Sequence, residues 1–153
     1  MGMNFRKRGG SVTGNCDANR IAWVALIQMI NNNPLLDYQK FDGVPTIYYS
    51  VLNQWARTQG IFLGADQQVG AVALDCVEQY CLQNRLPDMT ALVVRKDTKL
   101  PGEDFFVQHG IPLTSPSQLR PQWLAIAATV VQQRARYPIG SPADLCKYGN
   151  CVE

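Results

Sequence analysis

The side chains of this chain that could do covalent chemistry are five cysteines and a single histidine. Cys16 stands at the start of an apolar helical segment, where the helix N-terminus would lower the pKa of its thiol. His109 can act as the base that such a thiol requires. The two residues define a thiol-dependent enzyme as one hypothesis, although "FVQHG" offers no Asn or Asp beside His109 to orient its ring.

The other cysteines are spaced poorly for a metal site. Cys76 and Cys81 are five positions apart on a predicted helix and therefore point about 140° away from each other. Cys146 and Cys151 flank the turn "KYGN" and could bind a metal with outside ligands or close a small disulfide. An odd number of cysteines in 153 residues favours reduced thiols and a cytoplasmic location. We expect neither a metal nor a cofactor, because no glycine-rich phosphate loop and no H-E-x-x-H pattern is present.

Positive charge gathers at two places that are predicted to contact phosphate. The cationic residues are Arg95, Lys96 and Lys99 at a predicted turn and Arg6, Lys7 and Arg8 near the start of the chain. Gln67 and Gln68, at the start of a predicted helix, can hydrogen bond to the edges of bases. Because the net charge is only +2, any attraction to nucleic acid must be local. These residues together predict a DNA-associated binding module.

Acidic and aromatic residues indicate a different partner. Asp75 and Glu78 are predicted on the exposed face of the same helix as the glutamines, where they would repel phosphate. Tyr48 and Tyr49 are neighbours on a second predicted helix, so one of them can face outward and fill a pocket of a partner. The alternative hypothesis is therefore a protein-binding inhibitor or adaptor that acts on a host defence protein.

These side chains require a mainly helical α+β domain to position them. Apolar residues at helical spacing predict helices over residues 16–30, 47–58, 65–86 and 121–136. The segments "TALVV" (90–94) and "EDFFV" (103–107), joined by "RKDTKLPG", predict one β-hairpin with a basic tip. We expect a flexible basic arm over residues 1–15, one globular domain over 16–137 and a short turn-rich tail over 138–153. No membrane partner is expected, because the longest apolar run, Ile21–Ile30, is too short to span a bilayer and no export signal is evident.

The order of these elements, two helices and a connector followed by a hairpin, is that of a winged helix. Residues 43–106 resemble the DNA-binding domain of the alkyltransferase and alkyltransferase-like family. Where that family has a "TYG" helix start, an "AVG" motif and "NPxPxxxPCHRVV", this chain reads "TIYYSVLNQWA", "QQVGAVALD" and "NRLPDMTALVVRKDTKLPGEDFF". The resemblance implies a winged-helix-like core with an added N-terminal and C-terminal helix. Residues 89–93, "MTALV", lack the acceptor cysteine and its activating histidine, so alkyl transfer is not implied.

A second resemblance covers residues 86–106. This stretch is similar to a module of the type "LPPLTALVVNKKTGLPGEGF", found in uncharacterised phage and bacterial proteins and in segments joined to restriction-type HNH nucleases. The resemblance implies a setting of DNA or phage defence and assigns no catalytic residue. Since no convincing nucleophile, metal site or cofactor loop stands out, the leading hypothesis is a non-enzymatic binding module.

Overall fold

The computed structural model describes residues 14–33, 36–149 and 151–152. The elements, in chain order, are β1 (Gly14–Asn15), α1 (Cys16–Ile30), β2 (Gln39–Phe41), β3 (Val44–Tyr48), α2 (Tyr49–Thr58), the 3-10 turn η1 (Asp66–Gln68), the π-helical turn η2 (Gly70–Leu74), α3 (Asp75–Gln83), the 3-10 turn η3 (Met89–Leu92), β4 (Val93–Val94), α4 (Glu103–Gln108), α5 (Pro116–Gln132), the 3-10 turns η4 (Arg134–Arg136) and η5 (Leu145–Lys147), and β5 (Cys151–Val152). The prediction of a mainly helical α+β fold is confirmed.

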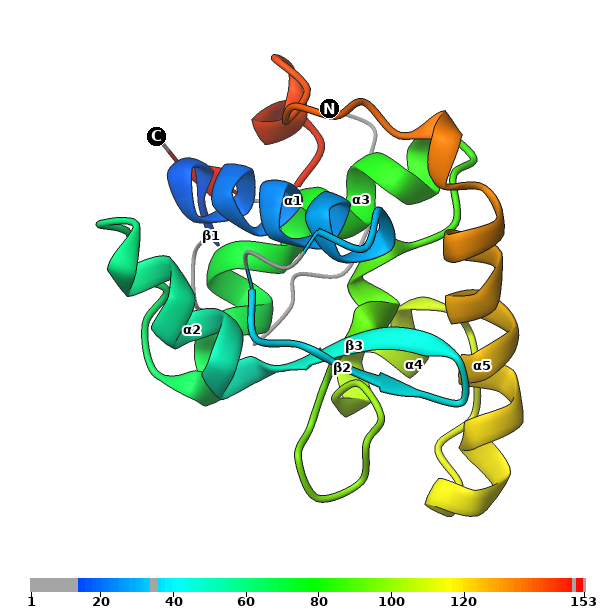
Figure 1. Ribbon diagram of the computed structural model, residues 1–153. Helices are drawn as coiled ribbons and strands as arrows, with labels where there is room; N and C mark the ends of the chain where they lie inside the picture. Colours follow the sequence, from blue (N-terminus) through cyan, green and yellow to red (C-terminus); the bar gives the residue numbers. More distant parts are fainter. Residues whose placement is uncertain (1–13, 34–35, 150, 153) are drawn as a thin grey trace.

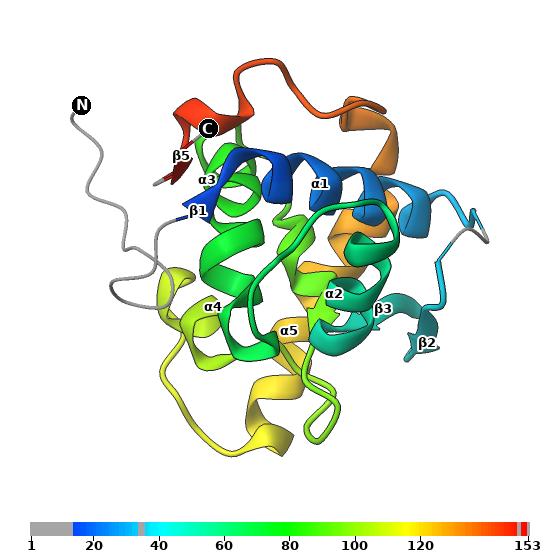
Figure 2. The ribbon, with the colours of Figure 1, turned by 90° about the vertical axis from the view of Figure 1, so that its left-hand side faces the viewer.

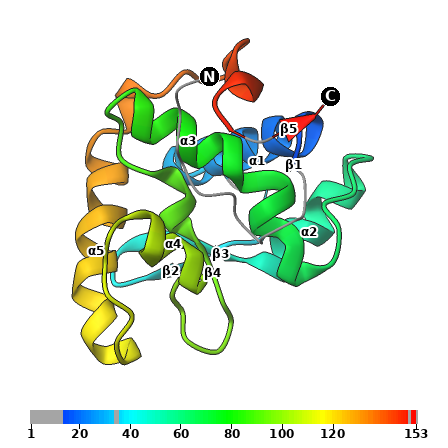
Figure 3. The ribbon, with the colours of Figure 1, turned by 180° about the vertical axis from the view of Figure 1, so that it is seen from behind.

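The helices pack around a small sheet with the strand order β2-β3-β4. Strands β2 and β3 are antiparallel, whereas β3 and β4 are parallel. Figure 1 shows α1 and α3 on one side of this sheet and α5 along its edge, and Figure 3 shows β4 beside β3 from behind. Trp23 of α1, Trp123 of α5 and the α4 pair Phe105 and Phe106 are among the largest side chains of the core, which all of these helices share.

The prediction for α1 is confirmed at both ends. Asn15 is the N-cap, and its Oδ1 accepts a hydrogen bond from the backbone N–H of Ala18 at 2.9 Å. The helix ends at Ile30, and Asn31 is its C-cap. Because apolar residues lie on nearly every side of this helix, it is buried along most of its length and lies at the centre of the fold.

The predicted β-hairpin over residues 90–107 is wrong. Its first half forms η3, where Asp88 Oδ1 accepts a hydrogen bond from the N–H of Thr90 at 2.9 Å, and only β4 is extended. Its second half is the helix α4. Glu103 and Asp104 occupy the first turn of α4, where carboxylates interact favourably with the N–H groups of a helix N-terminus. That local preference and the burial of Phe105 decide against a strand.

The hairpin that the structure contains lies earlier, between β2 and β3. Asp42 and Gly43 form its two-residue turn, with φ angles of 53° and 79°. Two positive φ angles are typical of the turns that close tight hairpins, and an Asp-Gly pair is the usual sequence for them. As a consequence α2 starts at Tyr49 and not at residue 47. Thr46, directly before the predicted start of that helix, lies in β3 and accepts a hydrogen bond from Gln39 Nε2 at 3.1 Å.

Two further helices differ from the predicted ranges. Helix α5 begins at Pro116 instead of Pro121, because Ser115 serves as its N-cap and Pro116 fits the first helical position. The third predicted helix is divided into η1, η2 and α3. The π-helical turn is wider than a regular helical turn, so the spacing predicted for one continuous helix over residues 65–86 is not kept along this segment.

Four of the five cysteines are paired, so the prediction of reduced thiols is wrong for them. Disulfides join Cys16 to Cys146 and Cys76 to Cys151, with Cα–Cα distances of 5.6 and 6.8 Å, and Cys81 is a buried free thiol. Both disulfides connect the tail to the body, and β5 pairs with β1 in parallel. Within the described ranges no helix combines the length and the apolar character needed to cross a bilayer.

Candidate functional site

A cleft with a volume of about 820 Å³ lies where four segments of the chain approach one another. These segments are the junction of β3 with α2, the turns η1 and η2, the loop after β4 and the start of α4. Figure 2 shows this loop projecting below α2, with α4 to its left. The described lining residues are Tyr48, Tyr49, Ser50, Asp66, Gln67, Gly70, Ala71, Arg95, Lys96, Asp97, Gly102, Glu103 and Asp104.

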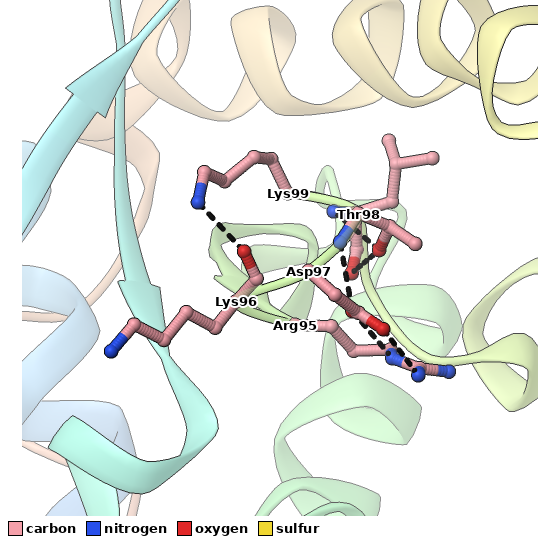
Figure 4. Close-up of polar contacts among 6 residues, drawn as sticks. Arg95, Lys96, Asp97, Thr98 and Lys99 are labelled. Atoms are coloured by element: carbon pink, nitrogen blue, oxygen red, sulfur yellow. Dashed lines mark hydrogen bonds and ion pairs between the residues drawn. The ribbon is translucent and has the colours of Figure 1, made fainter.

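The loop after β4, residues 95–99, is held in shape by its own side chains (Figure 4). Arg95 donates two hydrogen bonds to the carboxylate of Asp97, at 3.1 and 2.8 Å. The hydrogen bond from Arg95 is the main reason that the pKa of Asp97 lies below its ordinary value. Lys96 is exposed and extends away from this ion pair. The charge of Arg95 is therefore balanced within the loop.

Lys99 closes the same loop. Its backbone has a φ of 61°, in the left-handed region that glycine adopts more easily, and its N–H donates to the carbonyl of Arg95 at 3.0 Å. Its Nζ donates to the carbonyl of Lys96 at 2.7 Å and lies 4.9 Å from the centre of the Tyr48 ring. Arg120 of α5 supports the loop from behind, because its Nη2 donates to the carbonyl of Thr98 at 2.9 Å.

The two tyrosines at the end of β3 and the start of α2 have structural contacts on the wall of the cleft. Tyr48 carries the ammonium group of Lys99 over its ring. The hydroxyl of Tyr49 accepts a hydrogen bond from the N–H of Gly102 at 3.0 Å, which ties α2 to the N-cap of α4. Both side chains are half-buried, so each presents part of its ring to the cleft.

Carboxylates outnumber cations among the described residues of the cleft. Arg95 and Lys96 are the two cations, and Asp97 pairs with the first of them. The other lining carboxylates are Asp66, Glu103 and Asp104. The interior of the cleft is thus a poor place for a phosphate group, which each carboxylate would repel, and a better place for a positively charged group.

The remaining residues of the predicted DNA surface are not all in this cleft. Gln67 lines it, whereas Gln68 is exposed next to it and its Oε1 accepts a hydrogen bond from the N–H of Ala65 at 3.0 Å. The basic residues Arg6, Lys7 and Arg8 lie outside the described residues.

The predicted exposed acidic face of the third helix is wrong. Asp75 and Glu78 are 3% and 0% exposed, because the five consecutive residues 75–79 are all buried and this part of α3 has no side that faces solvent. Asp75 lies beneath the tail, where a Cβ added to Gly149 would meet its Oδ2 at 2.6 Å. Neither carboxylate can therefore form part of an exposed docking face for a partner protein.

The thiol and the imidazole of the predicted enzyme are also not a pair. Cys16 is buried and bonded to Cys146, which removes its thiolate. His109 caps the C-terminal end of α4, and its Nε2 lies 2.7 Å from Oδ2 of Asp88. Sequence reasoning missed Asp88 as the partner of His109, because 21 positions separate the two residues.

Asp88 and His109 belong to a buried polar cluster with Glu78 and Thr90. Thr90 Oγ1 is 2.7 Å from Asp88 Oδ1 and 3.4 Å from Glu78 Oε2. Burial alone would raise the pKa of Asp88, but its hydrogen bonds to His109, Glu78 and Thr90 and the charge of His109 outweigh burial and lower it. Burial, followed by the charge of Asp88, raises the pKa of the nearby Cys81 thiol well above its ordinary value.

One ligand atom each from Glu78, Asp88 and His109 lies within 4.8 Å of the other two, and these residue types can hold a metal ion. The only local sign of this cluster in the sequence is "PDMT", a typical start of a capped turn. Asp88, from this segment, meets Glu78 and His109 because of the way α3 and α4 pack in the fold.

Comparison with known proteins identifies no relative, because no family model, no curated protein and no solved structure matches this chain.

Proposed function

We propose that this chain is a non-enzymatic binding module that receives a positively charged segment of a partner protein in the cleft between α2, η1, the 95–99 loop and α4. The observation that carries this proposal is the charge of the cleft. Asp66, Glu103 and Asp104 line it in addition to the ion-paired Asp97, and two half-buried tyrosines stand beside them. A lysine or arginine of the partner would meet carboxylates there, and its aliphatic stem would pack on the tyrosine rings.

The walls of the cleft are held together by contacts between the segments, which favours binding without large rearrangement. Tyr49 is hydrogen bonded to Gly102 of the opposite wall, and Arg95 and Asp97 hold the loop between them. Asp66 accepts a hydrogen bond from Asn53 Nδ2 at 2.9 Å, so this carboxylate is oriented by α2. A binding site with fixed carboxylates loses little side-chain entropy when a cation enters it.

DNA binding through the 95–99 loop is the second candidate, and a specific observation favours it. The loop projects from the body beyond the sheet (Figure 1), and Lys96 on it is exposed. Lys99 Nζ donates to the carbonyl of Lys96 and Arg120 donates to the carbonyl of Thr98, so these cations lie on or against the loop and would attract a phosphate that approaches it. The phage-defence setting and the winged-helix-like core implied by resemblance belong to this candidate, but its wing cannot be the hairpin predicted over residues 90–107, which form η3, β4 and α4 instead.

Two double variants distinguish the candidates. Glu103→Gln with Asp104→Asn removes charge from the cleft, and Arg95→Gln with Lys96→Gln removes charge from the loop. Each is titrated with a short labelled lysine- and arginine-containing peptide and with a short labelled DNA duplex, at about 50 and about 200 mM salt. Asp17→Asn is the matched control for the acidic variant, because Asp17 is an exposed carboxylate on α1 that does not line the cleft.

If the proposal is right, the peptide binds and shifts the NMR signals of cleft residues, the acidic double variant weakens this binding, and neither the control nor the basic double variant does. If DNA binds instead, weakens as salt rises and is lost in the basic double variant, the second candidate replaces the first. Peptide binding that is equal in the acidic variant and the wild type would refute the cleft as the binding site.

A further inference from the structure

We propose that Glu78, Asp88 and His109 form a binding site for one Zn²⁺ ion. The three residues come from three separate parts of the fold: α3, the turn before η3 and the end of α4. Their ligand atoms, one from each residue, all lie within 4.8 Å of one another. This site is distinct from the cleft, because none of the three residues lines it.

The separations of these atoms suit a small ion. Ligand atoms at the usual zinc distances of about 2.0–2.2 Å are roughly 3.3–3.6 Å apart in a tetrahedral shell. His109 Nε2 and Asp88 Oδ2 are 2.7 Å apart, which is a hydrogen-bond distance, and no ligand separation in the group exceeds 4.8 Å. A zinc ion would therefore replace the contact between His109 and Asp88, and side-chain movements on the order of 1 Å would bring the three ligand atoms to these separations, with the fourth position left for water.

The types of ligand select among metals. One imidazole with two carboxylates suits Zn²⁺, whereas Ca²⁺ and Mg²⁺ prefer shells made of oxygen atoms alone. Thr90 Oγ1 lies beside both carboxylates and is positioned to be a neighbour of the ion. The chain has a single histidine, so a competing surface site made of histidines is excluded.

The surroundings hold the ligands in place, as second-layer contacts do at known metal sites. The N–H and Oγ1 of Thr90 both bind Oδ1 of Asp88, which leaves Oδ2 directed at His109. The ring of Phe105 lies 4.4 Å from the imidazole of His109 and limits its rotation. The side chain of His109 is 13% exposed and that of Asp88 is 0% exposed, so an ion would enter past His109.

The test measures metal binding by the full, oxidised chain after treatment with a chelator. Isothermal titration with Zn²⁺ should give one bound ion per chain, and the melting temperature should rise with Zn²⁺ but not with Mg²⁺ or Ca²⁺ at equal concentration. His109→Gln and Glu78→Gln should each weaken the affinity by at least about tenfold. Asp144→Asn, which alters an exposed carboxylate of the tail, should leave the affinity unchanged.

A second measurement keeps the proposal testable if a variant does not fold. In the wild-type chain the ¹⁵N resonance of His109 Nε2 should move on addition of Zn²⁺ in the direction typical of a metal-bound nitrogen. Absence of stoichiometric binding, or binding that leaves this resonance and the His109→Gln affinity unchanged, would overturn the proposal. The cluster would then be a buried hydrogen-bonded network without a metal.

Discussion

Replacement of Asn19 should destabilise the protein more than its small side chain suggests. Asn19 lies on α1 and is fully buried. Its Oδ1 accepts hydrogen bonds from the N–H groups of Cys76 and Val77 at 3.0 and 3.3 Å, and its Nδ2 donates to the carbonyl of Val72 at 3.1 Å. The first N–H groups of a helix have no hydrogen-bond acceptor within that helix. Here the side chain of Asn19, from α1, is the acceptor for two such N–H groups of α3.

The magnitude follows from the number of groups that the replacement leaves without a partner. Asn19→Leu would leave two buried N–H groups and one buried carbonyl without their side-chain partner, each at a cost of about 1–3 kcal/mol. Because these costs are not additive, we expect a loss of about 3–5 kcal/mol in the free energy of unfolding. This is a large part of the roughly 5–15 kcal/mol that a domain usually has.

Urea denaturation under non-reducing conditions measures this loss, and with a slope of about 2 kcal/mol per molar the midpoint should fall by about 1.5–2.5 M. Asn84→Ala is the matched control, because Asn84 also donates its amide to a backbone carbonyl, that of Tyr80 at 2.8 Å, but is exposed. Asn19→Ala separates the loss of hydrogen bonds from the loss of packing. If the cavity left by a smaller side chain were the main cause of destabilisation, leucine would be tolerated and alanine would not. A leucine variant within about 1 kcal/mol of the wild type would refute the argument from hydrogen bonds.

Three further predictions concern titratable groups. Alkylation of the unfolded, unreduced chain should modify one thiol, that of Cys81, because disulfides protect the other four; mass spectrometry that finds five modified thiols would contradict both disulfides. Burial raises the pKa of Tyr137 above its ordinary value of 10.0, so the unfolded chain loses this proton first and stability should fall as pH rises above about 10. Tyr137→Phe should flatten that alkaline part of a plot of denaturation midpoint against pH, and an unchanged slope would count against this assignment. Arg95→Gln should raise the pKa of Asp97 toward its ordinary value in a carboxyl NMR titration, because the hydrogen bond from Arg95 is the main cause of the lowering; an unaltered pKa would mean that the two side chains do not pair in solution.

The disulfides bear on the compartment in which the chain folds. Paired cysteines are typical of oxidising environments, whereas the sequence prediction of a cytoplasmic location relied on reduced thiols. The location of the protein stays a prediction, and the thiol count just described tests the premise on which it depended.

The cleft could be predicted in part from the sequence. Arg95, Lys96 and the two tyrosines were identified as binding residues, and the structure brings them to one place. Glu103 and Asp104 are adjacent in the predicted strand over residues 103–107, where neighbouring side chains point to opposite faces, whereas the helix α4 brings both to the same cleft. Sequence reasoning therefore located the cations of this surface but not the excess of negative charge around them.

The sequence by itself determined the features that depend on neighbouring residues. The approximate start of α1, its end before Asn31 and the mainly helical content follow from capping groups and apolar spacing that act over a few positions, and the structure selects Asn15 over Asp17 as the cap. The Asp42–Gly43 pair is likewise a local sequence signal for the β2–β3 hairpin turn, which the sequence prediction did not include.

Only the tertiary structure decided which polar groups are buried and which cysteines meet. Glu78, Asp88 and His109 converge because α3 and α4 pack on the same core, and Cys16 reaches Cys146 across 130 positions of the chain. The free energy of burial depends on segments that are distant in sequence: Asp75 is covered by the tail at Gly149, and Glu78 lies against Thr90. No local pattern carries that information.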